Sequence, residues 1–207
     1  MTPRHISIFL IFSSLFLIGF ALMGYEMLGS RYLNPYFGGG ITTWAALISV
    51  VLLAMMIGYL TGGYIVDARP SVTLLSIATL LGGLSIIVVP AFVDQSMEYI
   101  LQTLGDGLIG VLVGATLISF IPVALLSACS PFVVRLLLQD LNTGGKTTGW
   151  VYGVSTLGNV LGTLVTTFSL IPSFGTRTIT IYFGLILIAL AIFIFLLRSR
   201  ISGGLRN

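Results

Sequence analysis

Residues 178–197 read TITIYFGLILIALAIFIFLL, twenty consecutive residues without a charged side chain. A helix needs about 20 apolar residues to cross the hydrocarbon core of a bilayer. Five further stretches meet this requirement: residues 6–28, 41–66, 71–93, 108–130 and 150–171. The sequence therefore predicts an all-α polytopic membrane protein, with six transmembrane helices in one integral membrane domain over residues 1–207.

The first stretch, residues 6–28, also has the basic flank of a signal peptide at Arg4. Its apolar run is longer and more continuous than that of a cleaved signal. We therefore interpret it as the first span, and cleavage near Ala21–Gly24 is the alternative.

Composition excludes several classes of protein. Of the 207 residues, 57% are hydrophobic and 7% are charged, whereas a soluble domain carries about 25% charged residues. Fifteen charges cannot surround a core of this size, which argues against a soluble enzyme, a secreted disulfide scaffold and a nucleic-acid-binding domain. The single cysteine, Cys129, has no internal partner, and no His/Cys cluster has metal-ligand spacing. We expect no metal, no cofactor and no nucleic-acid partner; the lipid bilayer is the expected surroundings.

Basic residues predict the orientation. With six spans, one side of the membrane holds Arg4, Arg69, Arg135, Lys146, Arg198, Arg200 and Arg206, and the other holds only Arg31 and Arg177. Because lysine and arginine are enriched in cytoplasmic connections, both termini are predicted to be cytoplasmic.

Two connections are predicted to contain short helices. Residues 94–107 place Met97, Ile100, Leu101 and Leu104 at helical spacing, which is typical of a helix lying along the outer interface. Ser130 and Pro131 resemble a helix N-cap followed by its first residue. The alternative for the second segment is a kinked continuation of the fourth span.

Glycines concentrate in the second and fifth spans. The second contains Gly58, Gly62 and Gly63, and the fifth contains Gly149, Gly153, Gly158 and Gly162. Small residues four apart allow helices to pack closely in a membrane. A second interpretation is that these helices line a passage, since glycine-interrupted spans at corresponding places in inverted halves are typical of transporters.

Glu26 is the candidate polar group inside the first span. It lies about 30 Å along the helix from Ile6, so we expect it near the outer boundary, five residues before Arg31. It is either an interfacial charge, paired with Arg31 or hydrated, or an acidic group that attracts a cation at the outer mouth. No nucleophile has a histidine or lysine partner at a recognisable spacing, and the only histidine, His5, lies in the N-terminal tail. We expect no enzymatic activity.

The segment from Gly62 to Pro70 resembles the Gly-x-x-x-Asp-Arg-x-Gly loop motif of major facilitator transporters, with the arginine displaced by one place and proline in place of a glycine. In that family the aspartate and arginine latch the cytoplasmic ends of helices. The resemblance implies a conformational role for Asp67 and Arg69.

Nearly the whole chain resembles the membrane part of bacterial spermidine-synthase-like proteins, the fused major-facilitator/spermidine synthases. The residues that carry the resemblance are Glu26, Met27, Arg31, Pro35–Gly38, Trp44, Gly58, Tyr59, Gly62, Gly63, Asp67, Ser130–Phe132, Arg135, Gly149, Tyr152, Ser155–Gly158, Leu161, Gly162, Leu170–Pro172 and Gly175. It implies a half-major-facilitator-like bundle in a bacterial inner membrane and a polyamine-related role. That family usually carries a soluble aminopropyltransferase domain, which this sequence does not show.

Two functions follow as hypotheses. The first is transport of a polyamine or related cation, by a homodimer or with another partner. The second is a membrane anchor or scaffold for a separate aminopropyltransferase-like enzyme on the cytoplasmic face. The candidate solute-binding residues are Glu26, Arg31, Trp44, Tyr152 and Asn159. The candidate conformational or packing residues are Gly58, Gly62, Gly63, Asp67, Arg69, Pro131, Arg135, Gly149, Gly153, Gly158 and Gly162.

Overall fold

The structure is a computed structural model that describes residues 3–138 and 143–206. Within these ranges every regular element is helical, and six helical stretches are long and apolar enough to cross a membrane. This confirms the predicted all-α architecture with six spans. The elements are α1 (Pro3–Phe37), α2 (Ile41–Ala68), α3 (Val72–Leu104), α4 (Leu108–Ser127), α5 (Cys129–Leu137), α6 (Gly144–Val165), the π-helix η2 (Thr166–Leu170), α7 (Ile171–Ser173), α8 (Thr176–Leu196) and α9 (Arg198–Arg206).

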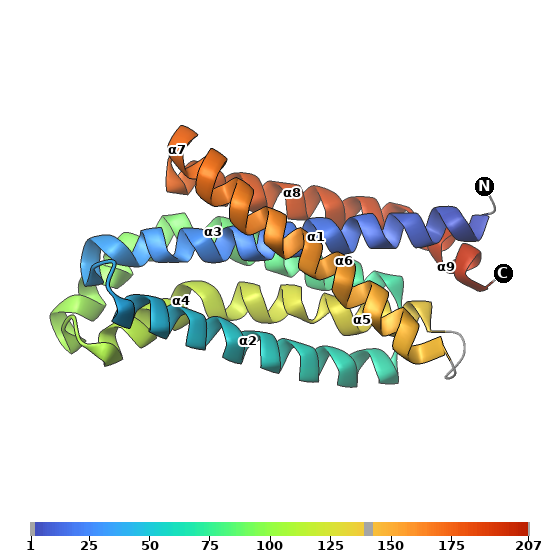
Figure 1. Cartoon of the computed structure of the whole chain (residues 1–207), viewed down its shortest axis with the longest axis horizontal. Helices are drawn as coiled ribbons and strands as arrows, with labels where there is room; N and C mark the ends of the chain where they lie inside the picture. Colours follow the sequence, from blue (N-terminus) through green and yellow to red (C-terminus); the bar gives the residue numbers. More distant parts are fainter. Residues whose placement is uncertain (1–2, 139–142, 207) are drawn as a thin grey trace.

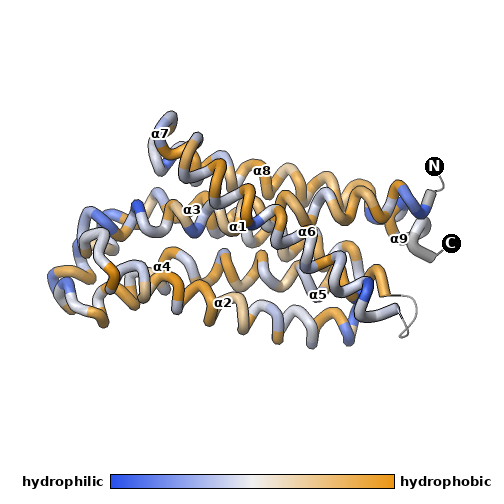
Figure 2. The backbone as a smooth tube through the Cα atoms, in the orientation of Figure 1, coloured by the Kyte–Doolittle hydropathy of each residue, from blue (hydrophilic) through white to orange (hydrophobic). Residues whose placement is uncertain are grey.

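The helices form one elongated bundle, and the beginning of α1 and the whole of α9 lie at the same end of it (Figure 1). We call this the terminal end, and the end that holds the α1–α2 and α3–α4 connections the distal end. Strongly hydrophilic residues gather toward both ends (Figure 2). This distribution is that of a bundle whose middle is surrounded by hydrocarbon.

Local chemistry determines where several helices begin and end. Glycines with positive φ follow α1 and α3: Gly38 has φ +75° and Gly105 has φ +73°. Other residues adopt this conformation only at a steric cost, so glycine is the usual helix terminator there. At the beginning of α3, the backbone N–H of Thr73 donates to Ser71 Oγ at 3.1 Å, a side-chain cap for an otherwise unpaired donor.

The predicted interfacial helix over residues 94–107 is wrong. Residues 94–104 are the last turns of α3, which runs unbroken for 33 residues, about 50 Å. The helix runs through Pro90, past the hydrocarbon thickness of about 30 Å, and ends only at Gly105, the first residue after its start with a positive φ. Its apolar residues Met97 and Ile100 are buried in the bundle, whereas a helix lying on the interface would turn them toward lipid.

The segment after Ser127 follows the alternative expectation. α5 begins at Cys129, and the residue between α4 and α5, Ala128, still has helical φ and ψ. Ser130 therefore lies within a slightly interrupted continuation of the fourth span and is not an N-cap. Residues 139–142, at the end of the second predicted short helix, lie outside the described residues.

Each of the six spans has one partner on which it packs most extensively: α1 on α6, α2 on α4, and α3 on α8. Numbered as spans, these are pairs 1–5, 2–4 and 3–6, a pattern that is unchanged when the first three spans are exchanged with the last three. Spans 1 and 4 run in opposite directions, so this exchange also reverses the direction of each span.

Glycines lie at two of these contacts, that of α2 with α4 and that of α6 with α1. A side chain at Gly58 or Gly62 of α2 would collide with Ala124 or Ala128, at the end of α4 and just after it. A side chain at Gly158 or Gly162 of α6 would collide with the backbone of α1 at Phe16 or Phe20. The close-packing interpretation therefore holds for these four glycines. A Cβ added at Gly63, Gly149 or Gly153 would meet nothing within 4 Å, so these three do not take part in such a contact.

Candidate functional site

One side of α1 is left open between α2 and α6. α6 crosses α1 obliquely, close to α2 at the terminal end and far from it at the distal end (Figure 1). The side-chain rings of Tyr59 on α2 and Tyr152 on α6 meet edge to face, with centroids 6.0 Å apart, and so connect the two helices near the terminal end. We call this region, which lies over α1 and between α2 and α6, the seam.

α6 is the least buried span. Only 17% of its most apolar stretch is buried inside the bundle, against 39–50% for the other five spans, and its mean hydropathy is also the lowest. One of its sides carries polar residues along its whole length, three or four residues apart. We call them the polar stripe: Thr148, Tyr152, Thr156, Asn159, Thr163 and, in η2, Thr167. Such spacing places side chains on one helix face, here the face next to α1.

Four residues of the polar stripe make contacts or line cavities that place the stripe along the seam. With its amide nitrogen turned toward the two carbonyls, Asn159 donates to Gly19 O of α1 at 2.9 Å and to Ser155 O at 3.3 Å. Thr148 and Tyr152 line a depression at the terminal end of the seam, and Thr167 lines a cavity at its distal end. The polar side of α6 is thus turned toward α1 and α2.

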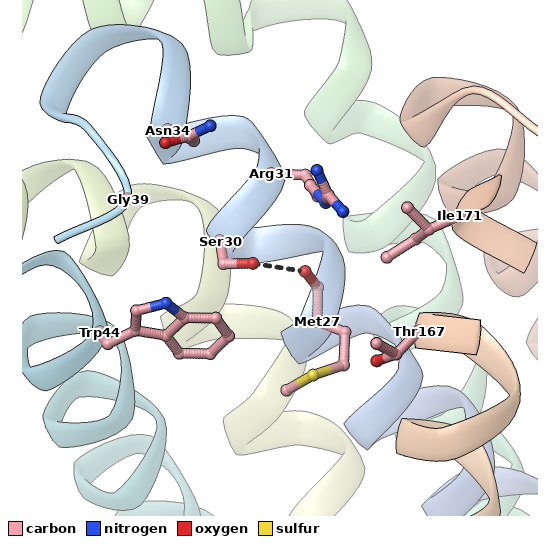
Figure 3. Close-up of a pocket in the computed structure, with 8 residues that line it drawn as sticks. All are labelled: Met27, Ser30, Arg31, Asn34, Gly39, Trp44, Thr167 and Ile171. Atoms are coloured by element: carbon pink, nitrogen blue, oxygen red, sulfur yellow. Dashed lines mark hydrogen bonds between the residues drawn. The ribbon is translucent and has the colours of Figure 1, made fainter. Parts of the chain in front are cut away.

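The distal cavity has a volume of about 210 Å³ and is formed by α1, the beginning of α2, and η2 with α7. In Figure 3, Met27 lies between Trp44 and Thr167, and Arg31 extends toward Ile171. The complete lining is Met27, Ser30, Arg31, Asn34, Gly39, Trp44, Thr167 and Ile171. The lining contains one charge, the Arg31 guanidinium, with hydroxyl and amide groups and the face of an indole. Such a site can hold a small polar solute through hydrogen bonds and aromatic contact.

The π-helix places Thr167 in this cavity. α6 widens into η2 over residues 166–170, and the short α7 follows with Pro172 inside it. Proline has no N–H for the helical ladder, and π-segments are frequent at functional sites. The Thr167 hydroxyl is buried beside this cavity and has no hydrogen-bond partner in the structure.

Glu26 lies eleven residues before the end of α1, which continues to Phe37. Its neighbour Tyr25 donates its hydroxyl to Ile118 O at 2.8 Å, and Ile118 is ten residues, about 15 Å, along α4 from Leu108. Because α1 is longer than the hydrocarbon thickness of about 30 Å, the position of Glu26 relative to the outer boundary stays a prediction. The structure records no ion pair between Glu26 and Arg31.

A second depression lies at the terminal end of the seam, with a volume of about 250 Å³. Asp67 of α2 and Arg135 of α5 both line it, and Arg135 Nε lies 3.4 Å from Asp67 Oδ1. Gly63, Pro131 and Tyr152 also line it. The contact joins the ends of two spans, and the partner of Asp67 in it is Arg135 rather than Arg69.

The predicted solute-binding residues therefore separate into different places. The structure brings Arg31 and Trp44 together in the distal cavity, Tyr152 lies in the terminal depression, and Asn159 binds the backbone of α1 between them. Glu26 does not line the distal cavity. Ser30, Asn34 and Thr167 were missed in the sequence analysis. Ser30 and Asn34 could have been found from their spacing at intervals of four residues after Glu26, which places them on one face of α1. Thr167 could have been found from the regular spacing of the polar stripe on α6.

The described residues contain no group of three or more His, Cys, Asp or Glu side chains placed to hold a metal ion. Comparison with known proteins yields no match to a family model, to a curated protein or to a solved structure.

Proposed function

We propose that this membrane protein is one half of a transport pathway for a small polar solute, and that the seam is the wall of that pathway. The observation that carries the proposal is the polar stripe of α6, a row of polar side chains within a candidate span, of which Tyr152 and Thr156 are exposed. Hydrocarbon cannot satisfy hydroxyl and amide groups, so a polar face in a span is normally turned to water or to protein. The inverted pairing of the two three-helix halves supports the same function.

A second copy of the chain is the proposed opposite wall. Two seams facing each other would enclose both polar stripes and both distal cavities, and a closed two-fold pair is the commonest arrangement of identical chains. The half-facilitator resemblance supports the same arrangement, because a facilitator pathway runs between two six-helix halves.

An amine is the first solute class to test, because the resemblance to spermidine-synthase-like proteins implies a polyamine-related role. The Trp44 ring supports binding of an ammonium group. Arg31, the only charged residue of the cavity lining, repels a polycation and attracts a carboxylate. We therefore expect a solute with one amine and one acidic group to be preferred over spermidine.

Cysteine accessibility tests whether the seam faces water. Cys129 is buried, so a Cys129→Ala background leaves one introduced thiol to react. We expect Thr163→Cys, on the polar stripe, to react with a membrane-impermeant maleimide or to cross-link to a second copy. The matched control is Leu161→Cys, on the apolar side of the same helix, which should do neither. Equal reactivity at both positions would contradict a water-lined or dimer-facing seam.

Flux measurements test the transport itself. Proteoliposomes holding the purified protein should take up a labelled zwitterionic amine faster than labelled putrescine or spermidine. Trp44→Ala and Arg31→Gln should reduce that uptake, whereas Leu161→Ala should not. Uptake of spermidine ahead of the zwitterion, increased by Arg31→Gln, would instead favour the polyamine as the solute.

The scaffold function has its own supporting observation. Arg69, Arg135, Lys146, Arg198 and Arg200 all lie at the terminal end, and each is exposed. This basic surface is suited to an acidic soluble partner. Co-purification of an aminopropyltransferase-like enzyme from native membranes, lost when Lys146, Arg198 and Arg200 are replaced by glutamine, would favour the scaffold over transport.

A further inference from the structure

Glu26 is a buried carboxyl group without a partner. Its side chain is 5% exposed, and its Oε2 has no hydrogen-bond partner in the structure. Through its neighbour Tyr25 it lies level with Ile118, about 15 Å along α4 from the distal end of that helix. An ionised carboxylate buried in the bundle is strongly disfavoured unless another group compensates its charge.

No cation on the surrounding helices compensates it. There is no Asp, Glu, Lys, Arg or His between Ile41 and Val66 of α2, between Leu108 and Ser127 of α4, or between Thr147 and Val165 of α6. On α1 the nearest charged residue is Arg31, which lines the distal cavity. On α3 and α8, Asp94 and Arg177 pair with each other. The titratable neighbour Tyr25 already donates its hydroxyl to Ile118 O.

Ser119 of α4 lies against the stretch of α1 that carries Glu26 and Gly29. The Cβ position of Gly29 lies 3.6 Å from Ser119 Oγ, and Gly29 follows Glu26 by three residues, on the same face of α1. Ser119 Oγ is also buried without a hydrogen-bond partner. Two unsatisfied oxygens, one from α1 and one from α4, thus lie on the same side of α1.

The number of oxygens around Glu26 distinguishes a proton from a metal ion as its ligand. Of the other unpartnered hydroxyls, Thr166 Oγ1 lies against Gly24, on a different side of α1, and Thr167 belongs to the distal cavity. A hard metal cation takes about six oxygen ligands, twice the number of side-chain oxygens that Glu26 and Ser119 together supply. A proton needs only one oxygen, and the resulting carboxyl group can donate to the Ser119 hydroxyl.

We propose that Glu26 is a proton-binding site of the pathway, neutral while it is occluded between α1 and α4 as in this structure. When the seam opens and water reaches the group, the O–H bond breaks, the proton passes to water and the carboxylate remains; closing requires a proton to return. The role in transport rests on the proposed function, but the occluded, neutral carboxyl group is independent of it.

Infrared difference spectroscopy of the purified protein in lipid at neutral pH tests the proton site without any solute. The carbonyl band of a protonated carboxylic acid should be present and should disappear in Glu26→Gln. The matched control Glu98→Gln, a substitution of an exposed glutamate on α3, should keep it. Ser119→Ala should shift the band, because its hydrogen-bond acceptor is lost. An unchanged band in Glu26→Gln, or the absence of the band from the unmodified protein, would overturn the proposal.

Flux separates this proposal from the proposed function. In proteoliposomes with an imposed pH gradient, Glu26→Gln should lose gradient-driven uptake of the zwitterionic amine and keep solute exchange at equal pH. Uptake that is driven by the gradient equally well in Glu26→Gln and in Glu98→Gln would overturn the coupling role. The band in a protein that transports none of the solutes would support the proton site and count against transport.

Discussion

Arg135 Nε lies 3.4 Å from Asp67 Oδ1, so the acidic residue at the end of α2 pairs with α5 and not with Arg69, two residues away on its own chain segment. Toward the distal end, Arg177 of α8 pairs with Asp94 of α3. Each pair joins two different spans at a bundle end, where the side chains are exposed to water. In a transporter, contacts of this kind can hold one end closed without fixing the membrane-embedded part.

We expect a measurable but small coupling between Asp67 and Arg135. A double-mutant cycle with Asp67→Asn and Arg135→Gln should give about 0.2–1 kcal/mol, because both side chains are exposed. The measurement is the free energy of unfolding in mixed micelles with increasing SDS. Arg69→Gln is the control, and its effect should add to that of Asp67→Asn. Coupling of Asp67 to Arg69 instead would contradict the observed pair.

The packing glycines predict a contrast within α6. Gly162→Ala places a methyl group against the backbone of α1 at Phe20, whereas Gly153→Ala meets nothing within 4 Å. We expect Gly162→Ala to lower the free energy of unfolding by about 1–3 kcal/mol, since the backbone of α1 must shift. Gly153→Ala should leave it unchanged or raise it slightly, because alanine favours the helix. Thermal stability measured by size-exclusion chromatography checks this, and equal effects would show that α6 does not pack on α1 through Gly162.

The hydrogen bond from Asn159 to α1 should contribute measurably to the free energy of unfolding. Asn159→Leu removes the hydrogen bond to Gly19 O, and interhelical hydrogen bonds in membranes contribute about 0.6–1.7 kcal/mol. We expect a loss in that range in SDS titration. Thr163→Val, one turn along the polar stripe, is the control because the structure records no hydrogen bond from its hydroxyl, and it should cost less. A larger loss for Thr163→Val would place the main contact elsewhere on the stripe.

The orientation remains a prediction of the basic residues. A green fluorescent protein fused after Asn207 should be fluorescent, and an alkaline phosphatase at the same place should be inactive, because the end with Arg69, Arg135, Lys146, Arg198 and Arg200 should be cytoplasmic. In the Cys129→Ala background, Asp106→Cys should react with an impermeant thiol reagent from outside intact cells. The reverse result for both reporters would place both termini outside.

Much of the fold could be predicted because each span is a local property. Twenty apolar residues between polar connections give a helix of the right length regardless of what surrounds it, and the six spans are confirmed. The ends of the helices were harder to predict: α3 runs through Pro90 and extends to Leu104, where Gly105 with its positive φ ends it. Apolar residues at helical spacing look the same in an interfacial helix and in a span that continues beyond the membrane.

The candidate site could be predicted only in part. Arg31 and Trp44 are polar or aromatic residues near the ends of adjacent spans, so their meeting in one cavity follows from the connection between α1 and α2. Thr167 comes from more than 120 residues further along the chain, and only the crossing angle of α6 and the widening at η2 bring it there. Neither the crossing angle nor the widening can be predicted from the sequence pattern of a single helix.

The sequence by itself determined the class of this protein and the number of its spans. The tertiary structure decided which spans pair, which four of the seven candidate glycines let them approach, that the charge of Asp67 is met by Arg135, and that Glu26 is buried within the bundle. The physical reason is that hydropathy is a sum over neighbouring residues in the chain. Depth, partners and satisfied hydrogen bonds depend on residues brought together from distant parts of it.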